Sequence, residues 1–93
     1  MYDIFYTGVV MPVIAVIKGM KVYMNYSLDE HNPPHIHGVI DDKRCSVALD
    51  GTVLEGKQFP KKMLNELVKF VQAHQKELKE MWAKQKFPKI KGD

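Results

Sequence analysis

The stretch HIHGVIDDKRCSVAL, residues 35–49, alternates apolar and polar side chains on both sides of an aspartate pair. This alternation predicts a β-hairpin with one buried face. A two-residue turn at the aspartates pairs His37 with Ser46, whereas a three-residue loop places His37 opposite Val47. We favour the two-residue turn, because it gathers the apolar side chains on a single face. These side chains are Ile36, Ile40, Cys45, Val47 and Leu49.

The other face of this hairpin carries the candidate functional residues, which are His35, His37, Arg44 and Ser46. Residues two apart on a strand share a face, so His35 and His37 are expected about 6.6 Å apart along the chain. Imidazoles titrate near neutral pH, and a guanidinium suits a phosphate group. The catalytic hypothesis makes either histidine a general base and Arg44 the group that stabilises a phosphate. The alternative is structural: the histidines cap backbone groups of the preceding loop and pack on its prolines.

Further strand patterns flank the hairpin. VIAVIKG, residues 13–19, and KVYMNY, residues 21–26, are rich in branched and aromatic side chains, and a glycine marks the turn between them. TVLEG, residues 52–56, follows an Asp-Gly pair, which is a strong turn signal in hairpins. The first half of the chain therefore predicts an antiparallel meander of four to five strands.

Residues 60–84 change to the period of a helix. At about 100° per residue their apolar side chains fall on one side, and Pro60 stands where a first-turn proline is tolerated. We expect one long helix that packs on the sheet, which makes the fold class α+β. The apolar side consists of Met63, Leu64, Leu67, Val68, Phe70, Val71, His74, Leu78, Met81 and Trp82.

The chain has 93 residues, which suits one domain with a single core. We place this domain at residues 11–84, with residues 1–10 as an N-terminal extension and residues 85–93 as an unpatterned basic tail. Cys45 is the only cysteine, so no intrachain disulfide forms. The longest apolar run is well short of the roughly 20 residues that span a bilayer, and the N-terminus lacks the basic start of a signal peptide. We expect a cytoplasmic protein.

Positive charge is concentrated in the C-terminal part. Residues 1–56 carry four basic and seven acidic side chains, whereas residues 57–93 carry ten lysines and four acids. Lys62, Lys69 and Lys76 are seven residues apart, which keeps them within about 40° of one another on the polar side of the helix. This lysine stripe is either a binding surface for RNA or another anionic partner, or an ordinary solvated face.

A metal site is a further hypothesis for the stretch DEHNPPHIHG, residues 29–38. His35 and His37 could share an ion, and Asp29 or Glu30 could supply a carboxylate ligand. The proline pair favours an extended chain and holds His31 apart from the other two, as a separate binding candidate. We expect that no cofactor is required, and the binding of a divalent metal stays open.

From residue 11 to about residue 82 the chain resembles a small bacterial family, domain of unknown function 4160. The resemblance rests on MPVIAVIKGMKVYMNY (11–26), DEHNPPHIH (29–37), VLEGKQFPKKML (53–64) and HQKELKEMW (74–82). The family's histidines match His31, His35, His37 and His74. The resemblance implies membership of a two-gene, toxin–antitoxin-like unit whose other half is a small protein encoded by a neighbouring gene. It implies no reaction and no catalytic residues.

Together, these observations predict a binding component of such a unit, which contacts a protein partner or RNA. One alternative is a small histidine-dependent ribonuclease, and another is a metal-binding domain that uses the histidines. No Ser-His-Asp array, phosphate loop or HExxH motif supports another class of enzyme. Whether the protein is an enzyme is left undecided by the sequence.

Overall fold

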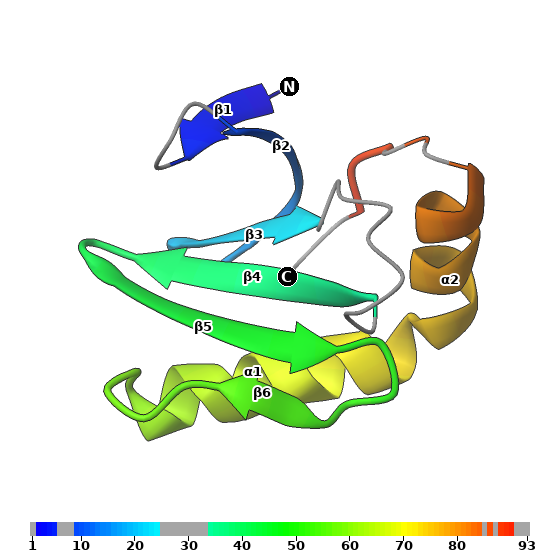
Figure 1. Ribbon diagram of the computed structural model, residues 1–93. Helices are drawn as coiled ribbons and strands as arrows, with labels where there is room; N and C mark the ends of the chain where they lie inside the picture. Colours follow the sequence, from blue (N-terminus) through cyan, green and yellow to red (C-terminus); the bar gives the residue numbers. More distant parts are fainter. Residues whose placement is uncertain (1, 6–8, 25–33, 85, 87, 91–93) are drawn as a thin grey trace.

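The computed structural model of the chain describes residues 2–5, 9–24, 34–84, 86 and 88–90, with side chains from residue 12 onward. Six strands form one antiparallel sheet in sequence order, and two helices follow it (Figure 1). The strands are β1 (Tyr2–Phe5), β2 (Val9–Ile17), β3 (Met20–Met24), β4 (His35–Ile40), β5 (Lys43–Ala48) and β6 (Val53–Glu55). The helices are α1 (Lys61–Ala73) and α2 (Gln75–Lys84).

The meander from β2 to β6 agrees with the expected antiparallel order. The strand β1 was not expected, because it lies in residues assigned to an N-terminal extension. It pairs with the first half of β2, from Phe5 opposite Val9 to Tyr2 opposite Pro12. No helix in the described part of the chain is long and apolar enough to cross a membrane.

The β4–β5 hairpin has the two-residue turn favoured from the sequence. Ile40 pairs with Lys43, which leaves only two aspartates in the turn, and His37 pairs with Ser46. Asp41 adopts a left-handed conformation with φ 53°, a region that aspartate tolerates better than most residues. The register places Ile36, Cys45 and Val47 on the buried face, as the alternation predicts.

The expectation of one long helix was wrong. The helix is interrupted at His74, where φ is −121° and ψ is 26°. The second helix, α2, therefore runs at an angle to α1 (Figure 1). The backbone N–H of His74 donates to the carbonyls of Phe70 and Val71, which ends α1. The His74 carbonyl then accepts from the N–H of Leu78 at 2.9 Å, so a new helix starts at once. Val71 and Leu78 are seven residues apart and both buried, so the apolar period continues through the interruption. The sequence pattern therefore gives no sign that the helix ends at His74.

The core lies between the sheet and the helices. Gly38 in β4 lies close to α1: a Cβ atom there would lie 2.8 Å from Cδ2 of Leu67. Glycine therefore lets the helix side chain contact the strand directly. Buried side chains from both layers form a single cluster, which includes Ile14, Met20, Val22, Met24, Ile36, Cys45, Val47, Leu67, Phe70, Val71, Leu78 and Met81.

The segment after α2, which the sequence predicts as a basic tail, contacts the sheet through Ile90. After α2 it turns back towards the sheet, and the N–H of Ile90 donates to the carbonyl of Ile14 at 2.6 Å. The Ile90 side chain packs against the core cluster. Because Ile14 lies at the irregularity between Val13 and Ala15 in the β2–β3 register, the tail bonds a strand carbonyl where regular pairing is interrupted.

Candidate functional site

His35 and His37 lie side by side on β4, on the face of the sheet away from the helices. Their rings meet edge to face, with centroids 4.8 Å apart and an interplanar angle of 82°. Both side chains are half-buried. The alternation of a strand places them together, and the side chain of the intervening residue, Ile36, points to the core.

His37 is held by its neighbours on the adjacent strands. Its Nδ1 atom lies 3.0 Å from Oγ of Ser46, its pairing partner on β5. Tyr23 on β3, which is 4% exposed, pairs with it from the other side. Tyr23 is not among the residues predicted from the sequence, because the register between β3 and β4 is set by the tertiary structure. Tyr23 on β3, His37 on β4 and Ser46 on β5 therefore form a row across three neighbouring strands.

The environment of His37 favours a neutral imidazole. Burial is the main cause that lowers its pKa from 6.5 to about 4, and the nearby positive charges of His35 and Arg44 act in the same direction. A hydrogen bond with the backbone of Cys45 opposes the shift. His37 is therefore uncharged at neutral pH, and one ring nitrogen is engaged with a serine hydroxyl.

Arg44 also lines a polar hollow of about 440 Å³ at the end of the sheet that carries the β4–β5 turn. Lys43 and Lys57 contribute two further cations, and Asp42 and Glu55 contribute carboxylates, with Gln58 beside them. Lys57 comes from the segment after β6, which the sequence did not connect with the hairpin. Arg44 connects the hollow with His37: it lies two residues before Ser46, the pairing partner of His37, and its charge helps to lower the pKa of His37.

A family model described as "Domain of unknown function (DUF4160)" matches residues 19–83. The chain belongs to the DUF4160 family. The match begins at the β2–β3 turn and ends in α2, so it contains the histidine pair, the polar hollow and both helices. No curated protein and no solved structure matches the chain.

The lysine stripe of this DUF4160 domain lies apart from the histidine pair. Lys62 and Lys69 are exposed on α1, and Lys76 is exposed on α2 beyond the break. The helices share a core with one face of the sheet, whereas His35 and His37 occupy the other face. The two sets of candidate binding residues therefore form two separate surfaces.

The metal hypothesis for the DUF4160 domain rests on residues at the edge of the described structure. Asp29, Glu30 and His31 lie outside the described residues. Within the described ranges, no group of three or more histidine, cysteine, aspartate or glutamate side chains is arranged to hold a metal ion. Cys45 is buried, and this burial raises the pKa of its thiol to about 11, so the thiol is protonated at neutral pH.

Proposed function

We propose that this DUF4160 protein is a binding component that contacts single-stranded RNA through the polar hollow and the adjoining histidine pair. One observation carries the proposal: Lys43, Arg44 and Lys57 line a single hollow, and Arg44 also acts on His37, one of two half-buried imidazoles in contact on β4. This arrangement combines groups that contact phosphate with flat rings that contact bases.

The cations of the hollow and the imidazole rings contact different parts of an RNA strand. Lysine and arginine neutralise phosphates, and proteins that bind single strands combine such cations with rings on which bases stack. A neutral imidazole suits stacking, and the low pKa of His37, about 4, keeps that ring uncharged at neutral pH. Unpaired RNA also presents base edges and 2′-hydroxyls, which the carboxylates and the amide of the hollow can bond as acceptors.

The ribonuclease alternative receives less support from the geometry. That alternative makes His35 or His37 a general base and Arg44 the group that stabilises the phosphate, and it leaves open which group acts as the general acid on the other side of the phosphorus atom. The rings of His35 and His37 are in contact, with centroids 4.8 Å apart, so a phosphate does not fit between them. Ser46 is 7% exposed, and the hydrogen bond between its hydroxyl and His37 accounts for a polar side chain at this buried position. Binding without cleavage is therefore the function that we favour.

The resemblance to two-gene units adds a protein partner to the proposal. We expect the product of the neighbouring gene to form a complex with this chain. Co-purification of the two proteins after joint expression tests this point, and His35→Ala serves as a variant at the sheet face. Failure of the two proteins to co-elute would remove the partner and leave the RNA contact to stand by itself.

Fluorescence anisotropy with a labelled single-stranded RNA tests the main proposal. The double variant Lys43→Gln, Lys57→Gln should bind about three- to tenfold more weakly at low salt, because two phosphate contacts are lost. Lys79→Gln, an exposed lysine on α2 that does not line the hollow, is the matched control and should bind like the wild type. Absence of RNA binding by the wild type, or equal binding by both variants, would contradict the proposal. Intact RNA at the end of the titration separates binding from cleavage.

A further inference from the structure

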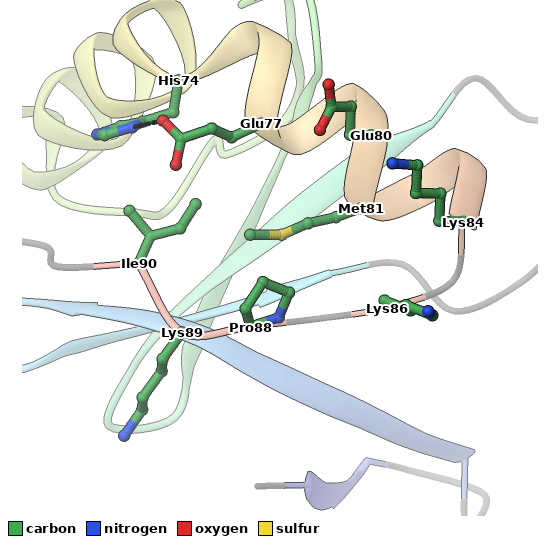
Figure 2. A pocket seen from close by; sticks show the side chains of 9 residues that line it. All are labelled: His74, Glu77, Glu80, Met81, Lys84, Lys86, Pro88, Lys89 and Ile90. Atoms are coloured by element: carbon green, nitrogen blue, oxygen red, sulfur yellow. Dashed lines mark hydrogen bonds and ion pairs between the residues drawn. The ribbon is translucent and has the colours of Figure 1, made fainter.

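A second hollow, of about 580 Å³, lies between α2 and the returning C-terminal tail (Figure 2). This volume is in the range of pockets that hold small organic molecules. The hollow lies away from the sheet face that carries the histidine pair, since its lining comes from α2 and the tail alone, apart from His74 at the helix break. It is therefore a site separate from the proposed RNA surface.

The floor of this hollow is apolar. Met81 points from α2 towards the tail, and Pro88 and Ile90 lie opposite it (Figure 2). The tail is fixed in this position by the bond from the Ile90 N–H to the Ile14 carbonyl and by the packing of Ile90 on the core. A small hydrocarbon body placed here would cover Met81 and Ile90 and lose contact with water.

The charged side chains around the floor favour an anion. Three lysines and two glutamates line the hollow, and one of these glutamates is already engaged: Oε1 of Glu77 lies 2.9 Å from Nδ1 of His74. Lys84 and Lys86 stand at the opposite end from His74 (Figure 2). The excess of lysine in residues 57–93 adds a positive field that attracts anions to this side of the molecule.

We propose that the hollow binds a small amphipathic anion, with its apolar body on Met81, Pro88 and Ile90 and its carboxylate at Lys84 and Lys86. The polarity of the hollow sets the orientation of the ligand, because the apolar floor lies between the end where Glu77 bonds His74 and the end that carries Lys84 and Lys86. The tail forms one wall, so ligand binding also holds the tail against α2.

Three probes of equal chain length test the chemistry of this site: decanoate, decanol and decylammonium, each below the concentration at which it forms micelles. The methyl resonances of Met81 and Ile90 are followed by NMR in the full chain. We expect decanoate to bind most tightly and to cause the largest chemical-shift changes at these methyl groups. Decanol should bind more weakly, and decylammonium should bind most weakly. No shift at these methyl groups with millimolar decanoate, or decylammonium binding as tightly as decanoate, would overturn the proposal.

Two sets of variants test the roles of the residues. Lys84→Gln with Lys86→Gln should weaken decanoate binding about three- to tenfold and leave decanol binding unchanged, since exposed charge pairs contribute modestly. Lys76→Gln with Lys79→Gln, on the same helix but outside the hollow, is the control and should change neither. Ile90→Ser should weaken both ligands. If the Lys84→Gln, Lys86→Gln variant lost affinity for decanol and decanoate equally, the lysines would not bind the head group.

Discussion

At the scale of single residues, the structure shows why His37 differs from an ordinary surface histidine. Its ring is packed between neighbouring strands, its Nδ1 atom meets the Ser46 hydroxyl at 3.0 Å, and its pKa is lowered to about 4. Protonation would place a charge in a half-buried site next to Arg44 and His35. The folded state therefore resists protonation, whereas the unfolded chain takes up the proton near pH 6.5.

This difference predicts a pH dependence of stability. Because the folded pKa of His37 is below the unfolded value of 6.5, its contribution is fully present above pH 6.5 and is lost as the pH falls towards about 4. We expect a loss on the order of 2–3 kcal/mol in the free energy of unfolding across this window. Urea unfolding at several pH values measures it. The curve of His37→Gln should be flatter than that of the wild type, with His74→Gln as the control, and parallel curves for wild type and His37→Gln would contradict the assignment.

At the scale of elements, the contact between α1 and β4 depends on Gly38. A Cβ atom at this position would lie 2.8 Å from Leu67 Cδ2, 3.0 Å from Met20 Sδ and 3.1 Å from Cys45 Sγ. All three neighbours are buried, with 1% exposure or less, so they have little room to move. The glycine therefore sets how closely the helix approaches the sheet.

We predict that Gly38→Ala lowers the free energy of unfolding by about 1–3 kcal/mol through overpacking. The same substitution should cost less in a Leu67→Val background, because valine has no Cδ2 atom to meet the added methyl group. Chemical denaturation of the two single variants and the double variant gives this coupling energy. Strictly additive effects would show that the crowding at Leu67 is not the cause.

At the scale of the whole molecule, the sheet separates the histidine pair from the lysine stripe of the helices. The polar hollow is lined by Lys43, Arg44 and Lys57 among others, and its lining does not include the exposed lysines of the stripe, Lys62, Lys69 and Lys76. We therefore expect a short RNA strand bound at the hollow to depend on the lysines that line it and not on the stripe. The stripe is then a solvated face for this function, as is common for lysine-rich helices.

This separation predicts different salt dependences. With an RNA of about six nucleotides, Lys43→Gln with Lys57→Gln should lower the slope of log affinity against log salt by about 0.7 for each lost phosphate contact. The triple variant Lys62→Gln, Lys69→Gln, Lys76→Gln should keep the wild-type slope. Anisotropy titrations at several salt concentrations measure both. A reduced slope in the triple variant and an unchanged slope in the double variant would move the RNA surface to the helices.

The sequence by itself determined the meander, the register of the β4–β5 hairpin and the shared face of His35 and His37. Each of these follows from local rules: a side-chain period of two along a strand, and a turn that gathers the apolar residues on one side. The apolar side of the helical region was also predictable, since Leu67, Phe70, Val71, Leu78 and Met81 are all buried. The family resemblance agreed with the match over residues 19–83.

Tertiary structure alone decided the features that join distant segments. The break at His74 keeps the apolar period, so no pattern reveals it, and it redirects α2 towards the tail. The bond from Ile90 to Ile14 and the approach of Lys57 to Arg44 join residues far apart in the chain. The low pKa of His37 depends on burial by neighbouring strands. Local periodicity fixes which way a side chain faces, whereas contacts between elements depend on the packing of the whole chain, and both hollows are products of that packing.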